Sequence, residues 1–326
     1  MNSRVYLLIA VAGSAVLSYF SGSLNSYYVQ ILTFIGINII LGVSLNLING
    51  HTGQFSLGHA GFMAVGGYTA GYLTTKLGPS ILAAMGGSTW WSEALLFSGS
   101  LLIGGVAAAV AGLIVGVPSL RLRGDYLAII TLGFGEIIRV LIQNTDAVGA
   151  SRGLTGIPGY TNLFWTFAIA AITIYTISSL VNSTYGRGFL TVRDDEIAAS
   201  AMGVNTTRYK VVAFVVGAFF AGVAGGLYAH STRYLTPEGF TFQKTVEIVI
   251  IVILGGMGNN FGVTVAAILL TVLLEALRSV SDFTWLPQFV RDLTKNRMIL
   301  FSIVLIALML LRPQGLFGGL RKPKRA

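Results

Sequence analysis

Apolar runs of about twenty residues recur along the whole chain and alternate with short polar connections. A run of this length, wound as an α-helix, matches the hydrocarbon thickness of a bilayer. Continuous runs are typical of spanning helices, which satisfy their own backbone groups in lipid. The pattern predicts an all-α polytopic membrane protein with about ten transmembrane helices. The runs are 5–20, 28–48, 55–75, 94–117, 125–142, 162–181, 209–230, 243–257, 261–278 and 297–311.

The composition agrees with this class. Hydrophobic residues make up 54% of the chain and charged residues only 10%, whereas soluble domains carry about 25% charged residues. No loop is long enough for a separate soluble domain, so residues 1–326 are predicted to form a single transmembrane domain. The first run follows Arg4 and fits either a signal sequence or a retained anchor. No small-residue cleavage site followed by a soluble domain is present, which favours the anchor.

The Lys and Arg residues predict the orientation, because they gather in cytoplasmic loops. The basic tail 321–326 and the loop 182–208, which is the longest of these, are expected in the cytoplasm. With about ten spans, the N-terminus lies there too. The outer loops are then 76–93, 143–161, 231–242 and 279–296, of which the last breaks the rule with Arg291, Lys295 and Arg297. The net charge of +9 is explained by inner loops facing anionic headgroups of the lipid bilayer, so no nucleic-acid partner is expected.

Several kinds of chemistry are excluded. The chain has no cysteine, so it has no disulfide and no thiolate ligand. No Lys follows a Gly, which rules out a G-x-x-x-x-G-K-[ST] phosphate loop, and any ATP-driven engine must be another polypeptide. His51 and His59 lack a third ligand for a metal. No nucleophile–base pair suggests an intramembrane enzyme. We therefore expect neither an enzyme nor a cofactor.

The segment 193–210, RDDEIAASAMGVNTTRYK, is unusually polar for this chain. It predicts a short helix with Asp194 as N-cap, Asp195 and Glu196 in the first turn, and Gly203 as its stop. Glu196, Ala199 and Gly203 share one smooth face. This pattern fits an ordinary surface helix, or a docking helix through which a soluble partner pushes on the membrane part.

Charged residues inside predicted spans form a second candidate group. Each costs about 2.5–3.5 kcal/mol at the bilayer centre. The pairs Glu136 with Arg139, and Glu275 with Arg278, have the spacing of self-neutralising helix pairs. Glu247 has no such partner in the sequence. These residues fit structural ion pairs, or a gate or subunit contact.

Small residues and breaks add further candidates. The stripes Gly67/Gly71, Gly112/Gly116 and Gly222/Gly226 predict close helix packing or a lining of the translocation path. The break GGMGNN at 255–260 fits a tight loop or a re-entrant turn, with Asn259 and Asn260 capping the next helix. The polar run from His51 to His59 is expected to cap an irregular third helix.

Several motifs in order resemble the branched-chain amino acid permeases of ATP-driven importers. The motif EIAASAMG resembles the family's E-A-A-x-x-x-G signature. The other similar stretches are LNLINGHTGQFSLGHAGFMAVGGYTAGYL (45–73), LRLRGDYLAIITLGFGEIIRVLIQN (120–144), GLTGIPG (153–159), ILGGMGNNFGVTVAAILL (253–270) and RPQGLFG (312–318). The chain departs from the family pattern at Ser200 or Ala201, where Glu is frequent.

The resemblance implies the importer permease fold, with 182–208 as a cytoplasmic coupling loop in a bacterial inner membrane. It implies three kinds of partner: a second related permease, two cytoplasmic ATPase subunits and a periplasmic binding protein. By position, the ATPase-coupling residues are Asp195, Glu196, Ala198, Ala199 and Gly203. Branched-chain or related amino acids are the expected solutes. Urea or short amides, and an ion-driven secondary transporter, remain as alternatives.

Overall fold

The computed structural model describes residues 3–119, 125–280, 306 and 315–317. Apart from one two-stranded ladder, these residues form helices and their connections. Most of the predicted span 297–311 lies outside the described residues, as do Arg121, Arg123, the basic residues of the last outer loop and the basic tail. The side chain of Arg278 is not described either.

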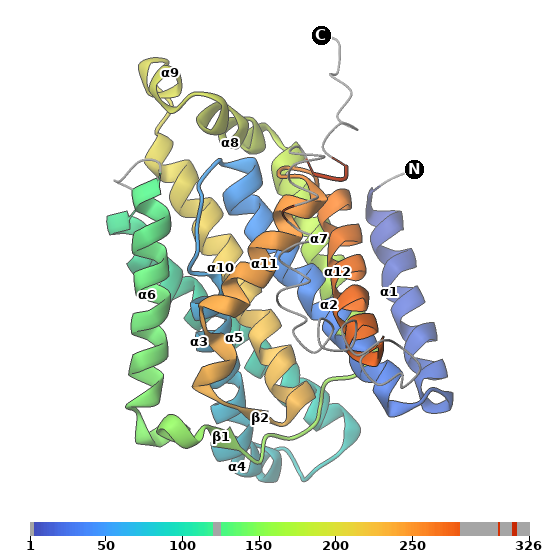
Figure 1. Cartoon of the computed structure of the whole chain (residues 1–326). Helices are drawn as coiled ribbons and strands as arrows, with labels where there is room; N and C mark the ends of the chain where they lie inside the picture. Colours follow the sequence, from blue (N-terminus) through green and yellow to red (C-terminus); the bar gives the residue numbers. More distant parts are fainter. Residues whose placement is uncertain (1–2, 120–124, 281–305, 307–314, 318–326) are drawn as a thin grey trace.

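The helices follow one another with short connections (Figure 1). The order is α1 (Ser3–Phe20), α2 (Ser26–Asn46) with a π-helical end (Leu47–His51), α3 (His59–Tyr72) with a π-helical end (Leu73–Leu77), α4 (Gly78–Ala84), α5 (Trp90–Ser119), α6 (Asp125–Gln143), α7 (Leu163–Asn182), α8 (Thr184–Asp194), α9 (Glu196–Ala201), α10 (Thr206–Thr232), α11 (Phe242–Gly255) and α12 (Asn260–Val280). The strands β1 (Leu154–Thr155) and β2 (Tyr234–Leu235) pair antiparallel, with Leu154 opposite Leu235.

Five helical stretches among the described residues are long and apolar enough to cross a membrane. They are Ser26–His51, Trp90–Pro118, Tyr126–Gln143, Leu163–Asn182 and Thr206–Thr232. The apolar parts of α1 and α12 are shorter, and α3 and α11 have 14 residues each. The prediction of an all-helical multi-pass membrane protein is thus confirmed, while the number of ten crossings stays a prediction.

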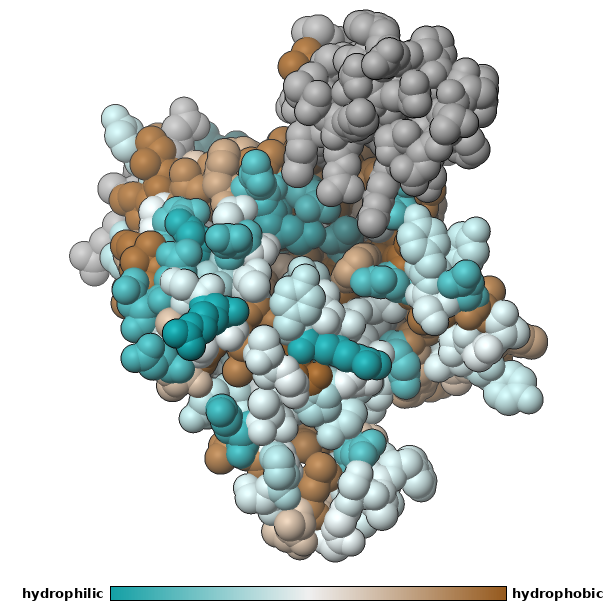
Figure 2. All heavy atoms as spheres, turned by 60° about the horizontal axis from the view of Figure 1, so that its bottom comes forward, coloured by the Kyte–Doolittle hydropathy of each residue, from teal (hydrophilic) through white to brown (hydrophobic). Residues whose placement is uncertain are grey.

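The connections gather at two opposite ends of the molecule. The start of α1, the helices α8 and α9, and the turn between α11 and α12 lie at one end, called here the α8–α9 end (Figure 1). The strands and α4 lie at the other, called the hairpin end. Hydrophilic side chains are spread over the hairpin end where it comes forward in Figure 2. The described segments that were predicted to share one side of the membrane therefore share one end of the molecule.

The centre of the bundle is α10, which packs against α5, α3 and α2. Glycines set the distances between these helices. A Cβ on Gly66 would overlap the backbone of Gly222, and a Cβ on Gly112 would lie 2.6 Å from the Cβ of Ala218. Lipid offers no hydrophobic force between helices, so such close packing holds them together. The packing interpretation of Gly112 and Gly222 is confirmed.

The predicted span 55–75 is wrong in its first part. Residues 52–58 are not helical, and α3 begins only at His59. Their backbone bonds elsewhere: Ser56 N–H donates to Asn49 Oδ1 at 3.2 Å, and Leu57 N–H donates to Thr131 Oγ1 of α6 at 3.0 Å. Side-chain acceptors on neighbouring helices thus replace the helical bonds that the sequence pattern predicts.

Candidate functional site

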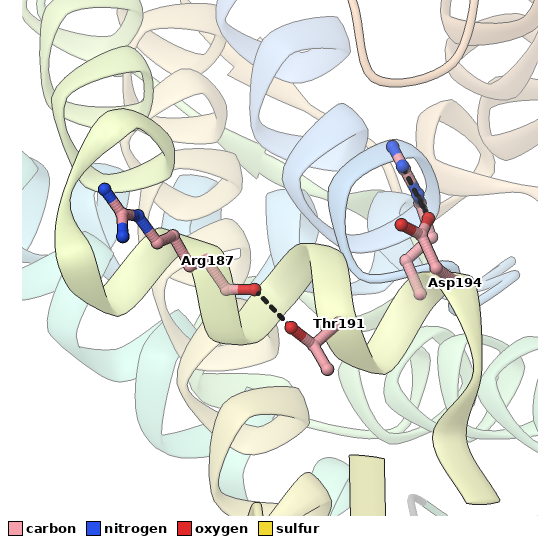
Figure 3. A network of polar contacts seen from close by, with 4 residues as sticks. Arg187, Thr191 and Asp194 are labelled. Atoms are coloured by element: carbon pink, nitrogen blue, oxygen red, sulfur yellow. Dashed lines mark hydrogen bonds and ion pairs between the residues drawn. The ribbon is translucent and has the colours of Figure 1, made fainter. Parts of the chain in front are cut away.

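Two capped helices, α8 and α9, make up the predicted coupling loop. Ser183 caps α8 by accepting from Gly186 N–H at 3.1 Å. Asp195, rather than the predicted Asp194, caps α9, since its Oδ1 accepts from the N–H groups of Ile197 and Ala198 at 2.8 and 3.0 Å. Asp194 ends α8 (Figure 3) and pairs with Arg193 at 2.6 Å. The predicted helix 194–203 is therefore the shorter α9, and a bend at Asp195 separates it from α8, whose last residue is Asp194.

Figure 3 shows Arg187, Thr191 and Asp194 along α8, and all three residues are exposed. Thr191 Oγ1 donates to the carbonyl oxygen of Arg187 at 2.9 Å, one turn earlier. The helix buries Phe189 and Val192 on its opposite face. The sequence analysis missed α8, although its alternation of buried apolar and exposed polar positions is a helical signal.

The orientation of α9 differs from the prediction. Ala199 is fully buried and Glu196 forms an ion pair of 2.6 Å with Lys210 of α10, so these two residues of the predicted smooth face are turned inward, whereas Gly203 is exposed. The outward side instead carries Ile197 and Met202, which are 68% and 83% exposed. Ala198 is exposed as well. The cause of the difference is Lys210, which lies near the start of α10 and draws Glu196 toward that helix.

Gly203 ends α9 as predicted. It has a left-handed φ of +81°, and the next residue, Val204, donates its N–H to the carbonyl oxygen of Ala199 at 3.0 Å. No atom lies within 4 Å of a Cβ built on Gly203, so this position needs glycine for its backbone conformation rather than for space.

An aromatic cluster fixes α8 to the start of α10. Tyr209 packs against Tyr185 and Phe189, with ring centroids 4.6 and 5.8 Å apart. A Cβ on Gly188 would overlap the Tyr209 ring, which explains how closely α10 approaches. With the Glu196–Lys210 pair, this cluster joins α8, α9 and the first turn of α10 into one body, called here the coupling segment (184–210).

The predicted ion pairs have different outcomes. Glu136 and Arg139 pair at 2.7 Å on α6, as predicted. The expectation that Glu247 has no partner is wrong, because Lys244, three residues earlier on α11, lies 3.1 Å from it. On α12, Glu275 accepts from the Tyr27 hydroxyl of α2 at 2.6 Å. Its predicted partner Arg278 is not described.

Polar side chains hold the turn between α11 and α12. Asn259 caps α12 as predicted, accepting from Gly262 N–H at 3.2 Å. Asn260 does not cap: it binds Asn46 at 2.8 Å and Ser178 at 3.1 Å, linking α12 to α2 and α7. Asn46 also accepts from Gly258 N–H at 2.8 Å. The break is a tight turn tied to its neighbours.

The described residues provide no metal site, and the cavity described next lacks the charged groups that an amino acid would need. Among the described residues, no three His, Asp or Glu side chains are placed to hold a metal ion. A cavity of about 590 Å³ lies between α1, α7 and α12 and is mostly apolar, with Ser14, Ser178 and Thr264 among its few polar lining residues. It offers no opposed charges for an amino acid.

The long apolar helices and their short connections define the class of multi-pass membrane proteins. Residues 27–311 match the family described as "branched-chain amino acid transport system / permease component". This chain belongs to that family, as its motifs indicated.

Similar proteins agree with this membership. The chain is 34% identical to the high-affinity branched-chain amino acid transport system permease protein LivM of Salmonella typhimurium and to that of Escherichia coli, over 78% of this chain and 61% of each relative. It is 25% identical to a probable LivM of Methanocaldococcus jannaschii, over 69% of this chain and 70% of that protein. The chain thus spans about 61% of the length of the two bacterial relatives. No solved structure matches it.

Proposed function

We propose that this chain is the membrane-spanning permease subunit of an ATP-driven importer for branched-chain or related amino acids. Family membership and the 34% identity to the LivM proteins support the solute class. The chain does no chemistry on its solute and provides the route through the membrane. It lies in a bacterial inner membrane with its α8–α9 end in the cytoplasm, where two ATPase subunits bind, and a periplasmic protein delivers solute to the hairpin end.

The coupling segment is the observation that carries this proposal. Ile197 and Met202 project from α9 as exposed apolar side chains at the α8–α9 end, while the buried Ala199 and Lys210 fix that helix to α10. Exposed apolar side chains on a rigid support are typical of protein contacts. A partner that binds there moves α10 with it. Glu196, Ala199 and Asp195 then act by holding α9 in place, and Ile197, Ala198 and Met202 touch the ATPase.

The second permease is proposed to cover α6. This helix exposes Ile129, Ile137 and Leu141 along one side, and its Glu136–Arg139 pair is partly exposed. Charged side chains that face lipid are unfavourable by about 2.5–3.5 kcal/mol each on insertion scales. A protein partner over α6 removes the pair from lipid. Glu136 and Arg139 are then a subunit contact beside the path.

Transport in proteoliposomes tests the proposed function. The complex purified from membranes is expected to take up leucine only with binding protein outside and ATP at the α8–α9 side. Uptake that survives ATP removal, driven by a proton or sodium gradient, would establish a secondary transporter instead. If the complex takes up urea or acetamide in place of leucine, the ATP-driven mechanism is supported but the proposed solute is wrong.

A further inference from the structure

Residues 52–58 form a non-helical segment within the depth of the membrane. His59, the residue after it, bonds to Ser44 Oγ at 2.9 Å, and Ser44 lies about two turns, about 10 Å, before the end of its helix at His51. The segment therefore descends from the α8–α9 end into the bundle before α3 begins. Non-helical backbone at this depth occurs where protein buries it or where it lines a path.

The upper end of this segment touches the coupling segment directly. Gly53 has a left-handed φ of +69°, and a Cβ there would lie 2.9 Å from Arg193 Cγ and 3.3 Å from Arg193 Cα. A side chain at position 53 would therefore meet Arg193, at its Cγ first and at its Cα next. Arg193 is the next-to-last residue of α8, so a displacement of α8 reaches Gly53 through the backbone and the first side-chain carbons of Arg193.

The segment is incompletely bonded in the arrangement described. Gln54 is only 4% exposed, yet neither its Nε2 nor its Oε1 has a hydrogen-bond partner. A buried amide without partners is unfavourable, and most native structures avoid it. A second arrangement of 52–58 that gives Gln54 its partners is correspondingly accessible. The lower end of the segment bonds to Thr131 of α6, the helix proposed to face the second permease.

We propose that Arg193 and Gly53 form the joint through which the coupling segment moves residues 52–58, and that these residues are a gate of the solute path between α3 and α6. The inference rests on the proposed function. When the ATPases displace α9 and α8, Gly53 follows Arg193, the bond between Leu57 and Thr131 breaks, and Gln54 finds partners in the new arrangement.

A double-mutant cycle in the reconstituted complex tests the joint. The quantity measured is leucine taken up per ATP hydrolysed in the same vesicles. Gly53→Ala is expected to lower this ratio about tenfold while the subunits still co-purify. Arg193→Ala lowers it less. In the double variant, part of the loss caused by Gly53→Ala is recovered, because the new methyl group no longer meets Arg193 Cγ. Gly86→Ala is the matched control, with a left-handed φ of +89° and no atom within 4 Å of its Cβ.

Additive effects in the cycle would overturn the joint, since backbone strain alone at Gly53 does not depend on residue 193. A wild-type ratio in Gly53→Ala would do the same. These results differ from failure of the proposed function, which shows as ATP-independent uptake in the unmutated complex.

Gln54→Leu tests the gate independently of the joint. It removes the unpartnered amide at similar volume, so the thermal stability of the complex is expected to rise or stay unchanged while uptake falls about fivefold. A stabilised protein with full uptake contradicts the gate, as does a loss of stability and uptake together.

Discussion

Lys210 Nζ lies 2.6 Å from Glu196 Oε2, and this pair turns the acid of the signature motif toward its own chain. The Lys210 side chain is almost fully buried, so Glu196 neutralises a charge that is otherwise costly to bury. α9 is thereby fixed to α10, the central helix. The acid of the motif thus holds α9 against α10, and in the proposed function the exposed apolar side chains of α9 contact the ATPase.

A charge exchange distinguishes this role from direct docking. Glu196→Lys places two cations together and is expected to lower the ATPase recovered with the permease about tenfold. The exchange Glu196→Lys/Lys210→Glu restores the pair and should recover most of the ATPase. Quantitative pull-down from membranes measures both. If the exchange recovers nothing, Glu196 contacts the ATPase directly.

The orientation of the chain is testable by single-cysteine labelling, because the chain has no cysteine of its own. Ile197→Cys at the α8–α9 end and Tyr234→Cys at the hairpin end both replace exposed side chains. An impermeant maleimide added to whole spheroplasts is expected to label only residue 234. In inside-out vesicles it labels residue 197, and bound ATPase protects that site. Labelling of residue 197 from outside would reverse the proposed topology.

The sequence predicted most of the helices but not the details of the coupling site. Long apolar runs identify spans such as α5 and α10 because length and hydropathy suffice in lipid. The non-helical segment 52–58 was not predicted from length and hydropathy, because the apolar residues that flank it give the pattern of a further span. The inward turn of Glu196 depends on Lys210, fourteen positions away along the chain. Such a contact exists only once α9 folds back on α10.

Helix packing in the centre gives a prediction about stability. A Cβ on Gly222 would overlap the Ala108 Cβ and lie 2.8 Å from the Gly104 carbonyl oxygen of α5. Gly222→Val is therefore expected to destabilise the bundle by about 1–3 kcal/mol. Gly99→Val on α5 is the control, because no atom lies within 4 Å of its Cβ. Thermal aggregation in detergent measures the difference, and equal midpoints for the two variants would contradict the packing described.

The ion pair on α6 predicts how the permease meets its partner. Glu136→Gln removes the carboxylate charge that lies 2.7 Å from Arg139, and Glu136→Gln/Arg139→Gln removes both charges. Removing one partner of an ion pair that is shielded from water destabilises a protein more than removing both partners, because the remaining charge is left without compensation. If the second permease covers α6, the single variant should weaken subunit pairing by about 1–3 kcal/mol and the double variant by less. Native mass spectrometry of the detergent-solubilised complex measures the paired fraction.

Glu238→Gln, which removes an exposed acid at the hairpin end, serves as the control for the loss of a negative charge. If α6 instead faces lipid, neither α6 variant changes the paired fraction. The single variant then lowers only the amount of protein inserted into the membrane, because an uncompensated cation is presented to hydrocarbon.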